Sequence, residues 1–386
     1  MHFDLVIVGG GLAGLSLACA LRDTPLKIAL LEQRPPARPE GWDARVYAIS
    51  PANVDFLQRI GVWKHLDTSR IARIDAMEVH GDAGARLDFS AYETGVAELG
   101  FILESALMAC ELWENVKRQP NLTLLCPGQP RSVELRDDAA VLGLADGSSL
   151  SARLLVAADG RDSWVRRAVG LDAFDSPYNE KGVVANFTCE KPHRGIARQW
   201  FSDDGVLAYL PLPGQRISIV WSAPDALADE LVALPAEELC LRVTAAGHRQ
   251  LGTLTALTPA AAFPLRLMRV PRVVAPRIAL IGDAAHGIHP LSGHGINLGY
   301  QDARVLAEVL GECKAWHDIG DLRILERYQR ARKEEVLLMQ TATDTLRRLF
   351  RADLPGAKPL RNLGMNLTNA LPVIKNKLVR YALGTL

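Results

Sequence analysis

The stretch Ile278–Asp302, IALIGDAAHGIHPLSGHGINLGYQD, lies late in the chain and decides how the rest is interpreted. It predicts a strand, a Gly-Asp pair, a loop rich in histidine and glycine, and then a helix. The N-terminal stretch Phe3–Leu21, FDLVIVGGGLAGLSLACAL, predicts a strand, a glycine turn and a helix. Both turns are of a kind that binds phosphates or sugar hydroxyls. Their separation indicates one large ligand held at both ends by a chain that folds back on itself.

Composition places the chain among soluble globular proteins. It has 386 residues, 48% of them hydrophobic and 23% charged, and a formal net charge of zero. This length suffices for one large domain or two of ordinary size, and the charge balance argues against a nucleic-acid partner. No apolar run is long enough for a transmembrane helix. The glycines that interrupt the apolar N-terminus, and the absence of basic residues before it, argue against a secretion signal.

The six cysteines are scattered, and none forms a C-x-x-C pair. We therefore expect reduced thiols in a cytoplasmic protein and no metal site. Three histidines within nine residues of the late loop are compatible with a metal, but their spacing argues against one.

The turn Gly9–Gly14, GGGLAG, satisfies the pattern G-x-G-x-x-G between a strand and a helix. In this pattern Gly9 permits the tight turn, Gly11 lets a pyrophosphate approach the backbone, and Gly14 lets helix and strand pack closely. Glu32 follows the next strand, at the spacing of a carboxylate that binds ribose hydroxyls. This motif predicts a dinucleotide, but by itself it does not separate NAD from FAD.

Two further turns favour FAD. Asp159 and Gly160 follow an apolar strand and precede a short helix, with Ser163 as its expected cap. Asp283 ends the strand Arg277–Ile281 and has the chemistry to accept hydrogen bonds from a polyhydroxyl chain such as the ribityl group of FAD. Asp159 taken alone is equally well explained as an ordinary turn residue.

These motifs together resemble the aromatic-hydroxylase group of flavoprotein monooxygenases, and within it most closely the ubiquinone-biosynthesis hydroxylases. The resemblance rests on GGGLAG with Glu32, ADGRDS (158–163) and GDAAHGIHPLSGHGINLG (282–299). DARVYAIS (43–50), IGVW (60–63) and YALG (381–384) extend it over essentially the whole chain. It implies non-covalent FAD, reduced by NADPH, NADH or another donor. O₂ would then form a flavin C4a-hydroperoxide that hydroxylates the ring of a polyprenylated phenol.

The resemblance also implies cofactor contacts for a defined set of residues. These are Gly9, Gly11, Gly14, Glu32, Arg45, Glu104, Asp159, Gly160, Asp283, Gly295, Ile296 and Asn297. Within this set Arg45 is expected on the flavin side, Asp283 at the ribityl chain, and Gly295, Ile296 and Asn297 at the flavin ring. The helix that begins near Gly295 would direct its positive end at the negative charge of reduced flavin.

The loop departs from its relatives at two positions, with His294 where Gln is usual and Gly287 where Thr or Ser is usual. His294 would titrate near neutrality beside the flavin, or its ring would simply fill the space of the Gln side chain. His289 and His294 are the weak catalytic candidates. No other acid, base or nucleophile stands out, in keeping with chemistry that the cofactor carries.

The chain is expected to be an α/β protein with an FAD-binding Rossmann-like domain of glutathione-reductase type. An inserted antiparallel sheet would form the substrate domain, and the C-terminus would be helical. We assign residues 1–75, 98–172 and 272–345 to the discontinuous FAD-binding domain and residues 76–97 and 173–271 to the substrate domain. Residues 227–244 are expected to form one helix. Tyr209, Trp221 and Phe263 are candidates for the wall of the substrate pocket, although ordinary sheet core is the stronger explanation for each of them taken singly.

Residues 346–386 form a basic amphipathic tail with eight Lys or Arg residues and one acid, Asp353. Such a tail suits an anionic membrane surface, as at the inner face of the inner membrane, or a complex of ubiquinone-biosynthesis proteins. It suits equally a helix packed on the cofactor domain. Two alternative functions stay open: a hydroxylase of a small soluble aromatic acid, and a weakly active flavin-binding component of a biosynthetic assembly.

Overall fold

The computed structural model describes residues 1–81, 84–293 and 295–351. Its first sheet is built around five parallel strands that come from the start, the middle and the late part of the chain. In spatial order they are β19 (Ile278–Leu280), β11 (Ser149–Ala157), β1 (His2–Val8), β2 (Ile28–Leu31) and β8 (Leu122–Leu125). The antiparallel β18 (Val274–Ala275) adds to β19, and the hairpin of β9 (Pro130–Leu135) and β10 (Ala140–Leu144) extends β11.

Both faces of this sheet are buried, which explains the unbroken apolar run of β1. Leu5 and Ile7 pack on the face covered by the helices, whereas Val6 and Val8 pack on the face covered by the β9–β10 hairpin. The helices on the first face are α1 (Leu12–Ala20), α2 (Pro51–Arg59), α4 (Ser105–Lys117) and α8 (Gly295–Gly311). The short α5 (Trp164–Ala168) packs on the second face. Burial on both sides is typical of a parallel sheet.

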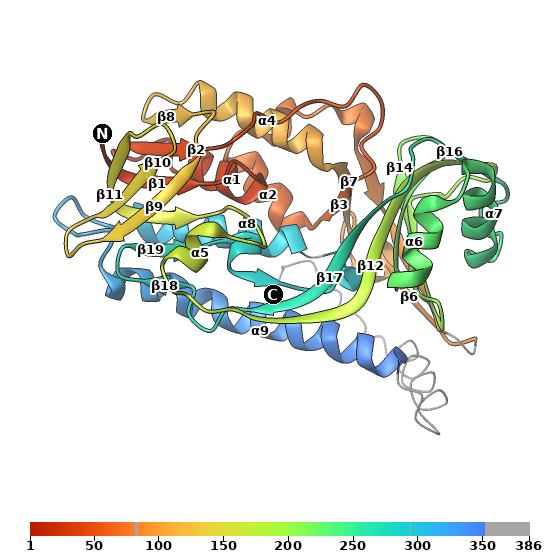
Figure 1. Cartoon of the computed structure of the whole chain (residues 1–386). Helices are drawn as coiled ribbons and strands as arrows, with labels where there is room; N and C mark the ends of the chain where they lie inside the picture. The colour runs from red at the N-terminus through yellow and green to blue at the C-terminus, as the bar shows by residue number, and fades with distance from the viewer. Residues whose placement is uncertain (82–83, 294, 352–386) are drawn as a thin grey trace.

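A small sheet of β3 (Val46–Ile49), β7 (Gly100–Glu104) and β4 (Ala72–Ile74) lies next to α8 and to the larger second sheet. The second sheet is almost wholly antiparallel and has the order β20-β17-β12-β15-β14-β13-β5-β6, with β16 paired to β12. Its strands are β5 (Ala76–His80), β6 (Arg86–Ser90), β12 (Phe174–Cys189), β13 (Ile196–Ser202), β14 (Gly205–Leu212), β15 (Arg216–Pro224), β16 (Leu254–Ala256), β17 (Ala261–Arg269) and β20 (His286–Gly287). The long β12 and β17 of this sheet extend from near β18 to α6 (Figure 1). The predicted α/β fold with an antiparallel second sheet is confirmed, whereas the residue boundaries of the domains stay a prediction.

The outer face of the second sheet is covered by α6 (Asp225–Ala233) and α7 (Ala236–Ala246). The expectation of one helix over residues 227–244 is therefore wrong. Leu234 has an extended ψ of 143°, and Pro235 caps the second helix. A proline has no N–H to donate and disfavours helical geometry at the preceding residue, so it divides the segment into two helices.

The long helix α9 (Leu322–Arg351) runs along both sheets (Figure 1). Near its start the Tyr328 hydroxyl donates to the Leu280 carbonyl at 2.8 Å, and further along Gln340 Nε2 donates to the Met268 carbonyl at 2.8 Å. Residues 346–351 of the predicted basic tail belong to this helix, and residues 352–386 lie outside the described part of the chain.

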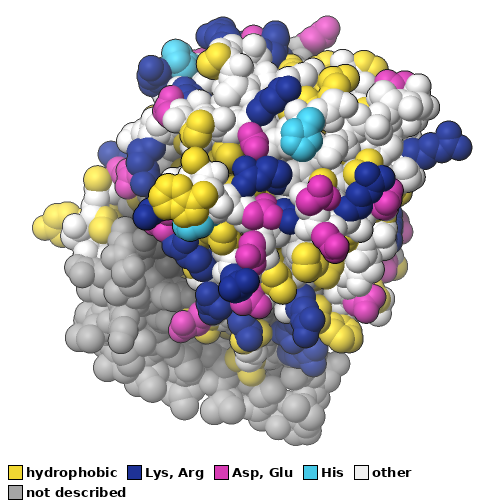
Figure 2. Space-filling view, turned by 90° about the vertical axis from the view of Figure 1, so that its left-hand side faces the viewer, with side chains coloured by type: hydrophobic (Ala, Val, Ile, Leu, Met, Phe, Trp, Pro, Cys, Tyr) yellow, Lys and Arg dark blue, Asp and Glu magenta, His cyan; other side chains and the backbone are white. Residues whose placement is uncertain are grey.

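The helices within the described ranges are too short or too polar to cross a bilayer. On the face shown in Figure 2, acidic and basic side chains are interspersed. Ion pairs on the described surface such as Arg304–Glu308 and Arg327–Glu312 follow the same mixed pattern.

Candidate active site

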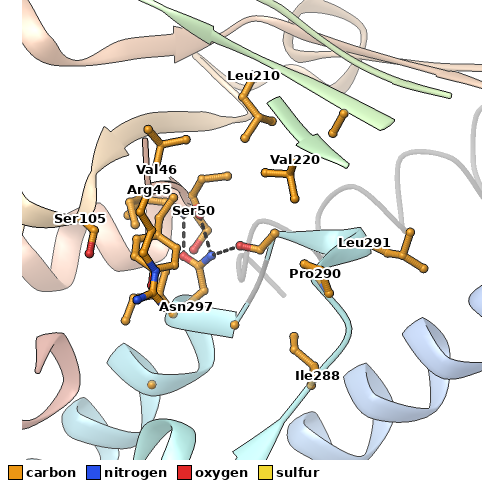
Figure 3. Close-up of a pocket in the computed structure, with 18 of the residues that line it drawn as sticks. Arg45, Val46, Ser50, Ser105, Leu210, Val220, Ile288, Pro290, Leu291 and Asn297 are labelled. Atoms are coloured by element: carbon orange, nitrogen blue, oxygen red, sulfur yellow. Dashed lines mark hydrogen bonds between the residues drawn. The ribbon is translucent and has the colours of Figure 1, made fainter. Parts of the chain in front are cut away.

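A cavity of about 720 Å³ lies between the first sheet and the second. Gly11 and Asp283 both line it, so the space between the two predicted turns is open. From there the cavity continues to the inner face of the second sheet, where Leu210 and Val220 line it. Figure 3 shows these two side chains on one side of the cavity and Pro290 of the late loop on the other. The volume is in the range of pockets that enclose a small molecule or cofactor.

Glycine is needed at three positions of the first turn, and the steric reason differs between them. A Cβ on Gly9 would lie 2.3 Å from the Ala158 carbonyl oxygen, and one on Gly14 would lie 2.1 Å from the Gly9 carbonyl oxygen. These two glycines therefore permit close packing of backbone on backbone. A Cβ on Gly11 would meet nothing within 4 Å and would project where Gly11 lines the cavity. Gly11 thus keeps open space at the N-terminus of α1, where free N–H groups favour an anion.

Glu32 lies at the end of β2, beside this turn. Its Oε2 accepts the Gly10 N–H at 2.6 Å, and its Oε1 accepts the Gln33 N–H at 2.7 Å. These bonds hold the carboxylate at the edge of the glycine turn. Contact with a ribose hydroxyl stays a prediction.

A buried network holds the turn that carries Asp283. The Asp302 carboxylate on α8 accepts the Gly282 N–H at 2.9 Å and the Arg332 Nε–H at 2.8 Å, and its Oδ2 lies 2.6 Å from His286 Nε2. Burial would raise the pKa of Asp302, but His286 and Arg332 outweigh burial and hold the pKa below its ordinary value. The network fixes Gly282, so the backbone next to Asp283 is held in place.

Arg45 lines the cavity, with its guanidinium over the Tyr47 ring at 5.5 Å. Glu104 does not line the cavity, and its expected cofactor contact is not supported. Its buried carboxylate accepts bonds from Arg70 Nε and Nη2, each at 2.7 Å, and from the Asp43 N–H at 2.6 Å. Glu104 therefore braces the loop that leads into Arg45.

Gly295, Ile296 and Asn297 line the cavity at the start of α8. The Asn297 side chain holds this helix to β3, because its Oδ1 accepts the Ser50 N–H at 2.9 Å and its Nδ2 donates to the Ala48 carbonyl at 2.7 Å (Figure 3). The helix end is thus fixed at the cavity wall.

Gly160 lines the cavity, but the Asp159 carboxylate is turned towards α5. It accepts the Ser163 hydroxyl at 2.5 Å and the Val165 N–H at 3.0 Å. Ser163 in turn accepts the Arg166 N–H at 2.9 Å, so its predicted capping role is confirmed. The local bonds of Asp159 match the ordinary turn role that the sequence left open.

The His289 ring is buried and does not line the cavity. Its Nε2 lies 3.0 Å from Glu180 Oε2, and its Nδ1 accepts the Leu291 N–H at 3.3 Å. Both ring nitrogens are engaged, so His289 braces the loop and the structure does not support a catalytic role. His294 lies outside the described residues.

The three residues predicted for the substrate wall lie in different places, and substrate contact stays a prediction. Phe263 lines the cavity, but Tyr209 and Trp221 pack on the outer face of the sheet under α6 and α7. The Tyr209 hydroxyl donates to the Val243 carbonyl of α7 at 2.6 Å. Because strand side chains alternate, the cavity instead receives their neighbours: Val206, Ala208, Leu210, Val220 and Ser222.

The geometry fits FAD. Gly11, Gly160 and Gly295 come from three distant parts of the chain, all line the cavity, and a Cβ on any of them would meet nothing within 4 Å. These three glycines leave an open space, called the glycine cradle below, that side chains at the same positions would fill. The residues that would hold the cofactor are Gly11 and the α1 N–H groups at one end, and Asp283 and the start of α8 at the other.

The fold and this cradle define a flavoprotein, and the comparison with known families agrees. Residues 2–342 match the FAD binding domain family, to which the chain therefore belongs. It is an FAD-dependent aromatic-ring monooxygenase of the group that includes the ubiquinone-biosynthesis hydroxylases.

Two curated relatives and two solved structures illustrate the likeness. The chain is 34% identical to "Ubiquinone hydroxylase UbiL" of Rhodospirillum rubrum, over 99% of this chain and 90% of that protein. It is 32% identical to "3-demethoxyubiquinol 3-hydroxylase" of Escherichia coli, over 99% and 98%. A PqsL mutant from P. aeruginosa aligns with a TM-score of 0.79 at 25% identity, covering 95% of this chain and 99% of that one. The p-nitrophenol 4-monooxygenase PnpA of Pseudomonas putida, at 19% identity with a TM-score of 0.79 and coverage of 99% and 98%, shares the fold.

Sequence reasoning missed the residues that position the site. Asp302, Arg332 and Glu180 hold the cofactor turns but do not line the cavity. One signal was available: Asp302 lies four residues from both Leu298 and Leu306, on the buried stripe of α8. A charged residue on such a stripe indicates a buried partner.

Proposed function

We propose that this protein hydroxylates the aromatic ring of a polyprenylated phenol in ubiquinone biosynthesis, using FAD, NADPH or NADH as the reductant, and O₂. The observation that carries the proposal is the continuity of the cavity. One end has the glycine cradle and Asp283, and the other end has an apolar wall from the antiparallel sheet. Bound FAD would supply the redox chemistry by passing electrons to O₂ and one oxygen atom to the ring.

The chain itself supplies orientation and a dry environment. Val184, Ala208, Leu210 and Val220 present aliphatic groups to the cavity from the sheet, and Leu291 lies opposite them. Such walls exclude water from the reacting centre and bury a hydrocarbon tail favourably. An electron-rich phenol activates its own ring, so the proposal requires no general base from the chain.

The apolar wall also favours a prenylated substrate over a small aromatic acid. The sheet lines the cavity mainly with aliphatic side chains, among them Val184, Val206, Leu210 and Val220. A carboxylate placed against those aliphatic side chains would lose its hydration. Arg198, the cationic residue that lines the cavity from β13, is paired through its Nε to Glu78 at 2.9 Å.

The test uses the purified full chain with FAD, NADPH and O₂. A short-tailed prenylphenol should gain one oxygen atom, measured by mass spectrometry of the product, and should stimulate NADPH oxidation. A simple hydroxybenzoate is the comparison substrate. Turnover of the hydroxybenzoate alone would assign the activity to small aromatic acids. Failure to oxidise either compound, in a protein that retains FAD, would favour a flavin-binding component of an assembly.

A further inference from the structure

Gln199 places a carboxamide in the apolar wall of the cavity. It lies on β13, opposite Ala208 of β14, which in turn lies opposite Val220 of β15. All three line the cavity, and Gln199 is only 5% exposed. A buried polar group in an aliphatic wall needs a hydrogen-bonding partner.

The bond that Gln199 makes fixes the direction of its amide. Its Nε2 donates to the Leu291 carbonyl at 3.2 Å, which joins the sheet to the loop on the other side of the cavity. A carboxamide has two N–H donors and an oxygen with two lone pairs, so this bond uses only part of its capacity. The remaining capacity lies where sheet and loop meet at the cavity.

Two neighbouring polar residues are less suited to the same role. Arg198 also lines the cavity, but its guanidinium pairs with Glu78 at 2.9 Å, and alternation along β13 directs its side chain to the face of the sheet opposite to that of Gln199. Ser222 lines the cavity one cross-strand row away, opposite Val206 rather than Ala208. Gln199 therefore has a longer polar side chain than Ser222, and it extends from the sheet into the middle of the wall.

We propose that Gln199 determines how the substrate ring is oriented, with its Oε1 accepting a hydrogen bond from the ring hydroxyl. The proposal rests on the proposed function, since it requires a phenol. A phenol hydroxyl buried in this wall would lose its hydration, and Gln199 is the group that can replace it. Because one end of the ring is then fixed, the same bond decides which ring carbon faces the cofactor.

The test compares a short-tailed prenylphenol with its O-methyl ether, which keeps the ring and tail but cannot donate. Binding is followed by the change in flavin absorbance, and the oxygen consumed is divided between hydroxylated product and hydrogen peroxide. The wild-type protein should bind the phenol about tenfold more tightly than the ether, as expected for one buried hydrogen bond. Gln199→Met should lose this preference and release more peroxide, while its affinity for FAD stays unchanged.

Gln340 offers a matched control. It is also a buried glutamine that donates to backbone carbonyls next to the same loop, at Met268 and Gly287, but it does not line the cavity. Gln340→Met should keep the preference for the phenol.

The outcomes separate the two proposals. If Gln199→Met keeps the wild-type preference, or if Gln340→Met abolishes it, the preference does not come from a bond between Gln199 and the hydroxyl, and the inference is overturned while the proposed function stands. If the wild-type protein binds and hydroxylates neither compound, the proposed function fails and the role of Gln199 fails with it.

Discussion

The carboxylate of Asp302 accepts a hydrogen bond from the backbone N–H of Gly282 at 2.9 Å, across twenty residues of sequence. The same carboxylate is bound by Arg332 of α9, whose side chain is 4% exposed. One buried acid therefore joins α8, α9 and the turn that carries Asp283. Both the binding of the cofactor and the stability of the helical layer should therefore depend on Asp302.

Asp302→Asn should lower the free energy of unfolding by about 3 kcal/mol, because it leaves the buried Arg332 without its main counter-charge. Affinity for FAD should fall as well, since Gly282 loses its acceptor. Chemical denaturation and FAD titration measure the two effects. Glu308→Gln on the same helix removes a surface pair with Arg304 and should cost about 0.5 kcal/mol. Equal losses in the two variants would contradict the role of the buried network.

The pKa of Asp302 predicts how this contribution depends on pH. The folded protein holds the pKa below the ordinary value of 3.8, so protons bind more readily to the unfolded chain. The stabilisation is therefore fully present above about pH 4 and is lost as pH falls through the folded pKa. Unfolding measured at decreasing pH should show the gap between wild type and Asp302→Asn narrowing below about pH 4. A constant gap through that range would show that Asp302 does not carry the effect.

Local patterns are enough to predict much of the fold and the cradle. The glycine turn between a strand and a helix has few alternative geometries, so GGGLAG by itself indicates that Gly9 makes the tight turn and that Gly14 is a packing position. The Ser163 cap is likewise predictable, because a cap involves residues only three positions apart. Interactions of this kind are encoded within one turn of chain.

Long-range arrangements are not predictable in the same way. Both faces of the second sheet are buried, so apolar alternation could not show that Val220 faces the cavity while Trp221 faces α6 and α7. The partner of Asp302 is thirty residues away on another helix. Glu104 was assigned to the cofactor by resemblance, but Arg70 occupies its carboxylate. These facts depend on the packing of whole elements.

Gly11 and Gly14 should respond differently to substitution. Gly11 has φ −75°, which any residue adopts, and a Cβ there meets nothing within 4 Å. Gly11→Val should keep the stability of the cofactor-free protein within about 0.5 kcal/mol but weaken FAD binding at least about tenfold, because the side chain enters the cradle. Gly14→Ala should instead lower stability by roughly 2 kcal/mol or more, because its Cβ would lie 2.1 Å from the Gly9 carbonyl oxygen. FAD titration and denaturation of both variants check the contrast, which a loss of stability in Gly11→Val would contradict.

Substitution of Leu346 in α9 should change the KM of a substrate to an extent that depends on the length of its tail. It lines the cavity and is 44% exposed, so it lies where the cavity reaches the surface. Leu346→Glu should raise the KM for a long-tailed prenylphenol about tenfold, because a charge there is unfavourable next to a hydrocarbon chain, and should leave a tail-less phenol unaffected. Leu338→Glu is the control, since Leu338 is 46% exposed on the same helix and does not line the cavity. Steady-state kinetics with both substrates test this prediction. An equal effect of Leu346→Glu on the two KM values would show that the tail does not pass this residue.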